Sequence, residues 1–151
     1  MIKTVTYRAR SMILNAMIFW IDVITTEFWP YAIKLAIDVV NNCPDDSGIT
    51  SLERFSSTKG QARVKQFHNF GYPCFILDPK MCQNKSIPKW TPQSRQAVYL
   101  GISPQHAGSV ALVLNLKTGY ISPQFHIVFD NDFTKTTARI TNHTRPQNVS
   151  K

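Results

Sequence analysis

AVYLGISPQHAGSVALVLNLKTGYISPQFHIVF, residues 97–129, is the part of the sequence that says most about the fold. It contains three short runs of aliphatic, aromatic and β-branched residues, 97–102, 109–116 and 124–129, with Lys117-Thr118-Gly119 at the place of a hairpin turn. A fourth run, YPCFIL, lies upstream at 72–77. Short strands separated by Gly and Pro predict a small antiparallel β-barrel, because closing a sheet removes its exposed edges.

Toward the N-terminus, the spacing of the apolar residues becomes that of helices. Apolar residues three and four positions apart predict a helix over residues 2–17 that buries one face. The residues of that face are Ile13, Ala16, Met17 and Trp20. Asp22 is expected to cap a second helix, which Pro30 should kink or offset and which should end at 41–44.

A loop rich in Asp, Ser and Gly follows, and Thr50 and Glu53 then have the Thr-x-x-Glu spacing of a capping box. This spacing predicts a short helix through Phe55. The fold class is therefore α+β, with an N-terminal helical pair ahead of a small antiparallel barrel. We predict helices in 1–56, a linker in 57–69, the barrel in 70–133 and a disordered tail in 134–151.

The net charge of +8 is concentrated in the middle of the chain. Residues 1–53 carry four Lys/Arg and six Asp/Glu, residues 54–95 carry eight and one, and the remainder carries five and two. A basic stretch attracts polyanions by releasing their condensed counterions, which favours a nucleic-acid partner. A solvated basic surface is the alternative explanation for the same composition.

Three cysteines without regular spacing, Cys43, Cys74 and Cys82, argue against a disulfide framework and for a reducing compartment. Together with His68 they lack the paired Cys-x-x-Cys of a structural zinc site, so buried or idle thiols are preferred. Basic residues precede an apolar run at 12–21, but no small-residue cleavage site follows and no run reaches the ~18 apolar residues of a membrane span. We expect no membrane partner.

Four stretches have an unusual order and spacing. They are RARSMIL (8–14), FWPYA (28–32) with Asn41-Asn42, FHNFGYPCF (67–75), and residues 95–130 with the landmarks YLGISP, TG, SPQFH and VFD. Together they resemble the integrase segment of copia-type retrotransposon polyproteins over nearly everything from Arg8 to Phe133. The sequence departs from the family at Tyr72, where a Cys usually follows Phe-Gly.

The resemblance implies the last helices of a ribonuclease-H-like catalytic core followed by a Src-homology-3-like barrel. Family members cut and join DNA with two aspartates and a glutamate that hold divalent metal ions. By the resemblance, that glutamate would precede Ile2 and both aspartates would come earlier still. We therefore expect a truncated, non-catalytic fragment without a cofactor, Mg²⁺ being expected only for the full-length family member, and a reading frame that is the relic of a decayed element.

The remaining acids do not replace the missing ones. Asp22, Glu27 and Asp38 are five and eleven residues apart, so they cannot all converge on a helix. Asp130 and Asp132 share a strand face by their period of two, yet two carboxylates lack the rest of a two-metal site. Ser, His and Gly residues also lack the spacing of a nucleophile elbow or a phosphate loop.

Two basic groups are the expected DNA contacts. One lies on the first helix, and the other surrounds a tryptophan in the long insert before residue 95. The residues are Lys3, Arg8 and Arg10 in the first group and Lys80, Lys85, Lys89, Trp90 and Arg95 in the second. Such cations contact phosphates and an exposed ring stacks on a base, so the expected binding is non-specific.

Each group has a structural alternative: the helix cations as a solvated face, and Trp90 as a residue that packs on the barrel. Helical aromatic residues that have lost the rest of a catalytic core are expected to leave apolar surface exposed. The alternative function is therefore a protein–protein surface of an integrase multimer, with incidental DNA affinity. By the resemblance, the location would be the nucleus or a cytoplasmic particle.

Overall fold

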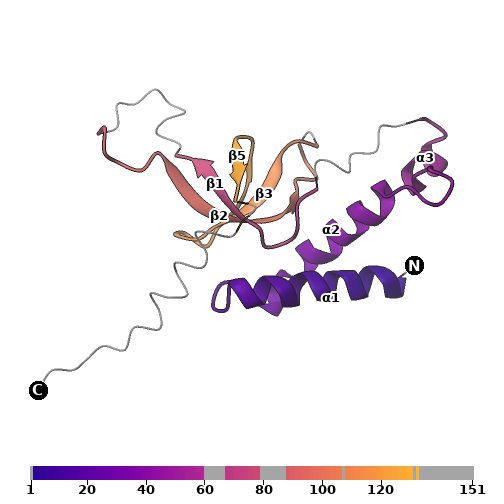
Figure 1. The fold of residues 1–151 in the computed structure, drawn as a ribbon, viewed down its shortest axis with the longest axis horizontal. Helices are drawn as coiled ribbons and strands as arrows, with labels where there is room; N and C mark the ends of the chain where they lie inside the picture. Colours follow the sequence, from indigo (N-terminus) through magenta and orange to yellow (C-terminus); the bar gives the residue numbers. More distant parts are fainter. Residues whose placement is uncertain (1, 60–66, 79–87, 107, 131, 133–151) are drawn as a thin grey trace, which may run out of the picture.

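The computed structural model describes residues 2–59, 67–78, 88–106, 108–130 and 132 (Figure 1). The chain is α+β, with the helices first and the strands after them. The helical elements are α1 (Ile2–Phe19), the 3-10 turn η1 (Thr26–Phe28), α2 (Trp29–Asn42) and α3 (Ser51–Ser56). The strands are β1 (Pro73–Leu77), β2 (Ser94–Ile102), β3 (Ala111–Asn115), β4 (Ile121–Gln124) and β5 (Ile127–Phe129).

Helix α1 confirms the predicted first helix and most of its buried face, although Met17 is only half-buried. Ala9, Ile13 and Ala16 are buried, and Trp20, directly after the last helical residue, is only 3% exposed. Spacings of four, three and four place these side chains on one side of the helix. That side packs against α2 and against the turn before β1.

The start of α2 corrects the predicted second helix. The helix begins at Trp29, and Asp22 lies exposed in the turn after α1 instead of capping it. Pro30 occupies the first turn of α2, where its missing N–H would have had no partner in the helix. Pro30 therefore helps to begin this helix and does not kink it. The predicted end is confirmed, because α2 stops at Asn42.

The predicted capping box at α3 is confirmed. The backbone N–H of Glu53 donates to Thr50 Oγ1 at 3.1 Å, and the backbone N–H of Thr50 donates to Glu53 Oε2 at 2.9 Å. Each side chain thus satisfies a backbone donor that the first helical turn leaves free.

The five strands form one antiparallel sheet in the order β4-β3-β2-β1-β5. Strand β1 pairs with β2, β2 with β3 and β3 with β4, and the predicted turn between β3 and β4 has Gly119 at φ +71°. The single strand predicted for 124–129 is wrong. The chain turns at Phe125-His126 because β4 pairs with β3 at one edge, whereas β5 returns to pair with β1 at the other.

The predicted barrel is not closed within the described residues. Strands β4 and β5 are the two edges of the sheet, and no pairing joins them. Both edges are short, with four and three residues, which limits the row of unpaired backbone groups that an edge presents. The described fold is thus an open five-stranded sheet.

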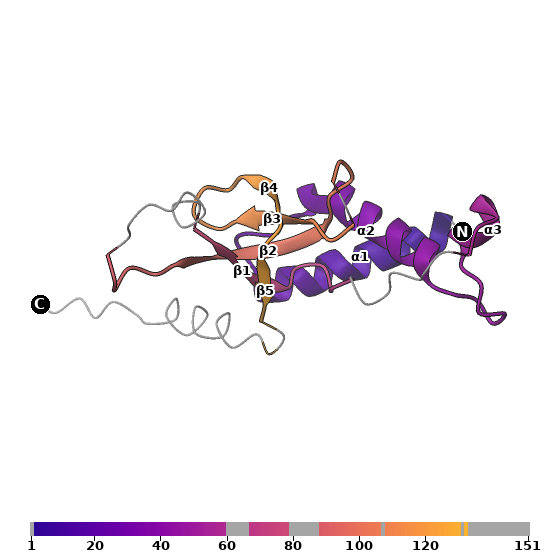
Figure 2. The same ribbon diagram turned by 90° about the horizontal axis from the view of Figure 1, so that it is seen from above.

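The helices and the sheet share one hydrophobic core. In Figure 1 the sheet lies above α1 and α2, and the view in Figure 2 shows the end of β2 over α2. Trp20 Nε1 donates a hydrogen bond of 2.7 Å to the carbonyl oxygen of Gly71, and a buried cluster continues from α1 and α2 into β1, β2 and β3. The boundary between 1–56 and 70–133 stays a prediction. The predicted tail at 134–151 and residues 60–66 of the predicted linker lie outside the described residues.

Strand β2 contains a bulge where it meets α2. Tyr99 pairs with Val113 and Gly101 with Leu112, so Leu100 has no directly opposite partner. A Cβ at Gly101 would lie 3.7 Å from Leu35 of α2, which is ordinary contact. All residues from 97 to 101 are buried, whereas a strand covered on one face buries every second residue. Both faces of this part of β2 are therefore covered.

Candidate nucleic-acid interface

The first predicted group of cations lies exposed on α1. Lys3, Arg8 and Arg10 are all exposed, and the helix contains no Asp or Glu. Lys3 and Arg10 are seven residues apart and share one side of α1, whereas Arg8 lies on another side, about 200° from Arg10 around the axis. The helix is thus positive without concentrating its three charges at one point.

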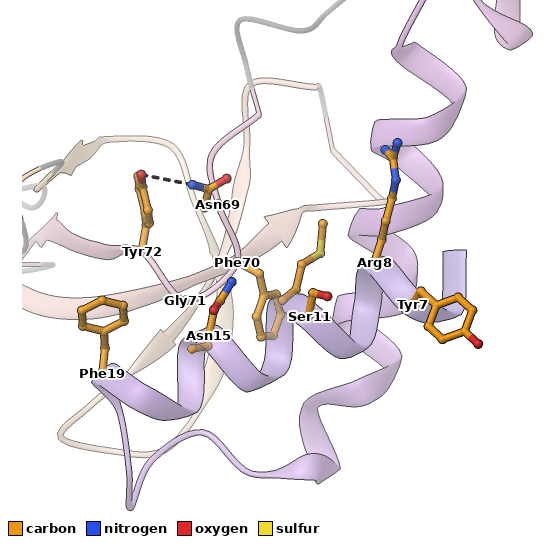
Figure 3. A pocket seen from close by; sticks show the side chains of 11 residues that line it. Tyr7, Arg8, Ser11, Asn15, Phe19, Asn69, Phe70, Gly71 and Tyr72 are labelled. Atoms are coloured by element: carbon orange, nitrogen blue, oxygen red, sulfur yellow. Dashed lines mark hydrogen bonds between the residues drawn. The ribbon is translucent and has the colours of Figure 1, made fainter. Parts of the chain in front are cut away.

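Arg8 borders a groove between α1 and the turn at residues 69–72 (Figure 3). The groove has a volume of about 590 Å³. Tyr7 and Arg8 lie at one end and Phe19 and Tyr72 at the other, and Asn69 Nδ2 donates a 3.1 Å hydrogen bond to Tyr72 Oη. Ring surfaces, one amide and one cation are groups that contact nucleobases and phosphates.

Sequence reasoning did not identify this groove, since its two walls come from segments about 50 residues apart. The only local signal was the Phe-x-x-Phe-Gly-Tyr run at 67–72, which indicated a strand entry and not a hollow. The groove forms because Gly71 lets the chain approach Ala16 of α1 closely.

The second predicted group is only partly described. Trp90 is 91% exposed, and Lys89 Nζ lies 6.0 Å from the centroid of its ring. The alternative in which Trp90 packs on the sheet is therefore not seen. Lys80 and Lys85 lie outside the described residues.

Arg95 does not join the exposed cations. It lies on β2, half-buried, with its Nε 3.9 Å from Asp78 Oδ2. An arginine that already faces a carboxylate attracts a phosphate less strongly, because the carboxylate neutralises part of its charge. Arg95 thus stays a predicted contact with a competing partner.

The two groups lie far apart in the fold. In Figures 1 and 2 the start of α1 is at one end of the molecule, and the segment that leads into β2 is at the opposite end. The cations therefore do not form one continuous described patch, and any ligand that contacts both has to extend along the molecule.

A Ser–His contact that sequence reasoning missed lies between β2 and β3. Ser103 is buried, and its Oγ is 2.8 Å from His106 Nδ1. A nucleophile of this kind needs a base that a third group orients. No such group contacts His106 in the described part of the chain, where the ring instead meets the edge of Phe125. The pair therefore closes a loop.

Burial shifts the pKa of three titratable groups in or next to β1 and β2. Burial raises the pKa of the Cys74 thiol to about 12, so this cysteine is a poor metal ligand or nucleophile. The His68 ring stacks on Phe129 with 3.5 Å between centroids, and burial lowers the pKa of this histidine. Burial also raises the pKa of Tyr99, whose ring meets both of these rings edge-on.

The described ranges hold no group of three or more His, Cys, Asp or Glu side chains arranged to bind a metal ion. Asp130 and Asp132 follow the end of β5 and do not share a strand face. Among the helices that the structure describes, none has the length and hydropathy needed to cross a membrane.

Comparison of the chain with protein-family models, curated proteins and solved structures found no match. The resemblance to copia-type integrases therefore remains an interpretation of the residues.

Proposed function

We propose that this chain is a non-catalytic, nucleic-acid-binding part of a copia-type retrotransposon integrase. It binds DNA without sequence preference, through phosphate contacts and ring stacking. The order and spacing of the four sequence stretches support the family, and the distribution of exposed cations supports the ligand.

The finer fold that we propose is the end of a ribonuclease-H-like core followed by a Src-homology-3-like barrel. One observation supports the barrel. The last strand returns to pair with the first, as expected when a small sheet curls toward closure.

The observation that carries the proposed ligand is the environment of Trp90. A tryptophan that is 91% exposed leaves a large apolar ring in water, and Lys89 holds a positive charge beside it. A stacked base covers the ring while its phosphate meets the charge, so one nucleotide satisfies both groups.

The test measures binding of fluorescent single-stranded and duplex oligonucleotides by anisotropy at several salt concentrations. Neutralising about five phosphates on duplex DNA gives a slope of log K against log salt between about −4 and −5. A slope near zero contradicts the proposed function.

Substitution of the ring tests the stacking step. We expect Trp90→Ala to weaken single-strand binding about tenfold or more, and Lys89→Ala to make the salt slope about one unit shallower. Tyr120→Ala and Lys117→Ala are matched controls, because both side chains are exposed on the β3–β4 hairpin. Equal losses in variants and controls would show that Trp90 has no special role.

The alternative function, a protein–protein surface in an integrase multimer, is favoured by a different observation. The outward side of α1 exposes several large apolar side chains. Their arrangement leads to the inference below.

A further inference from the structure

The outward side of α1 carries an apolar stripe that is exposed in the described structure. We call it the outer stripe. It consists of Tyr7 at 67% exposure, Leu14 at 51%, Ile18 at 64% and Ile21, just after the helix, at 69%. Tyr7, Leu14 and Ile21 recur every seven residues, which is the repeat that pairs helices in coiled coils.

The outer stripe lies opposite the buried side of the same helix. Ala9, Ile13 and Ala16 face the core, so α1 is apolar along two sides, and only one of them is used within the chain. Scattered exposed apolar residues are normal, but several that share one side of a helix are typical of an interaction surface.

Charge along this element is strongly polarised. The cations Lys3, Arg8 and Arg10 all lie in the first half of α1, the second half carries no charge, and Asp22 follows in the exposed turn. The ion pairs of the described residues join Arg54 to Asp45 and Arg95 to Asp78, so neither Lys3 nor Asp22 is paired within that part of the chain.

We propose that the outer stripe binds the outer stripe of a second copy of this chain, with the two α1 helices antiparallel about a twofold axis. Such an interface uses the same patch on both partners, so it must be complementary to itself. The antiparallel direction places the positive first half of each helix beside the negative turn of the other. A parallel pair would instead set Lys3, Arg8 and Arg10 beside the same cations.

Apolar pairing alone allows more than one register, since a crossing at Leu14 would pair Tyr7 with Ile21, and the charges select one of them. In the sequence, the midpoint between Tyr7 and Ile18 falls between Met12 and Ile13, and the midpoint between Lys3 and Asp22 is the same. An antiparallel pair that crosses at that point therefore sets Tyr7 beside Ile18 of the second copy. It also sets Lys3 beside Asp22 of the second copy. Apolar and ionic complementarity thus agree on the same crossing point.

The contact is small, which determines how it must be measured. A helix of 18 residues is about 27 Å long. One such stripe buries less than the roughly 800 Å² per partner of a standard stable interface. We expect association in the micromolar-to-millimolar range, and this association does not depend on the proposed nucleic-acid binding.

The first experiment is sedimentation equilibrium of the nuclease-treated full chain over a wide range of concentrations. We expect a monomer–dimer equilibrium that Leu14→Lys weakens about tenfold or more, because it places a charge in the centre of an apolar contact. Lysine is a good helix former, and circular dichroism checks that the fold is kept. The matched control is Tyr120→Lys, on the distant hairpin, which should dimerise like the parent chain. Absence of a dimer at all concentrations, or equal loss in both variants, overturns the proposal.

Charge reversal tests the direction of pairing. Lys3→Glu and Asp22→Lys should each weaken the dimer, and the double variant should restore it, since the two charges attract again after both are exchanged. No recovery in the double variant contradicts the register.

Disulfide trapping gives an independent readout of which positions face each other. In a Cys43→Ser, Cys82→Ser background, chains with Tyr7→Cys are mixed with chains with Ile18→Cys and oxidised in air. We expect the mixed disulfide between positions 7 and 18. Predominant links between identical positions indicate a parallel pair and overturn the proposal. Normal DNA binding by Leu14→Lys separates this result from the proposed function.

Discussion

Gly71 is the residue at which the sheet comes closest to α1. Its φ is +83°, and a Cβ at this position would lie 2.5 Å from Ala16 Cβ and 3.2 Å from Ala16 Cα. The carbonyl group of Gly71 itself also accepts the hydrogen bond from Trp20. A side chain here is therefore opposed by both backbone conformation and packing.

We expect Gly71→Ala to lower the free energy of unfolding by about 2–5 kcal/mol. Gly48→Ala is the matched control, since Gly48 has a similar φ of +73° but would place its Cβ in open space. That variant should lose only about 1–2 kcal/mol. Urea unfolding measures both, and similar losses would show that the approach to Ala16 costs little.

His68 makes stability depend on pH. Burial lowers its pKa below the ordinary value of 6.5, so between that value and the folded pKa the unfolded chain binds the proton more readily. Stability contributed by this group is therefore complete above pH 6.5 and decreases as the pH falls toward the folded pKa. His68→Phe keeps a ring for Phe129 to stack on and removes the titration. Urea unfolding between pH 5.5 and 7.5 should show a shallower pH dependence in the variant, and an unchanged one would contradict this assignment.

At the scale of single residues, the sequence showed that the charges on the first helix would be exposed but not what they would face. Lys3, Arg8 and Arg10 were expected on the polar side of a helix and are exposed. The groove beside Arg8 needed a contact between α1 and a turn far along the chain. Burial of Arg95 beside Asp78 likewise depends on strand pairing that residue types alone do not specify.

At the scale of elements, the features that depend only on neighbouring residues were predicted correctly. The capping box and the Gly119 turn each satisfy their own backbone groups, so both appear where the spacing placed them. The predicted cap at Asp22 failed because Pro30 is more favourable in a first turn than inside a helix. The strand predicted for 124–129 failed because its two halves pair with opposite edges of the sheet.

The capping box should contribute to the stability of α3. We expect Thr50→Ala to cost about 1 kcal/mol, because the backbone N–H of Glu53 loses its acceptor. Thr50→Ser keeps the hydroxyl oxygen and should cost much less. Amide hydrogen exchange of residues 51–56 measures the effect, and equal protection in both variants would show that α3 does not depend on this cap.

At the scale of the whole molecule, the sequence predicted the α+β class but not the contact between its two halves. The helices were expected to be left without a sheet to cover, whereas α2 packs on β2 and α1 packs on the turn before β1. Periodicity shows that a face is apolar without showing which partner covers it. The closed barrel likewise stays a prediction, because within the described residues the sheet is open.

The proposed function also predicts what the whole chain fails to do. Purified protein with Mg²⁺ or Mn²⁺ should neither nick nor join labelled oligonucleotides, because strand transfer in the family requires three metal-holding carboxylates. Denaturing gels after long incubation measure nicking and joining, with a reaction in buffer without the protein as the control. A second purification step guards against contaminating nuclease. Metal-dependent cleavage that co-purifies with the protein would remove the non-catalytic assignment.

The contact of Gly71 with Ala16 and Trp20 affects how related sequences can diverge. These three positions depend on one another although Ala16 and Gly71 are more than fifty residues apart. A change at one is therefore tolerated only with changes at the others. In related sequences that drift neutrally, Gly71 would vary as freely as Gly48. Copies in which Gly71 stays fixed while Gly48 varies would be under purifying selection to keep a folded product.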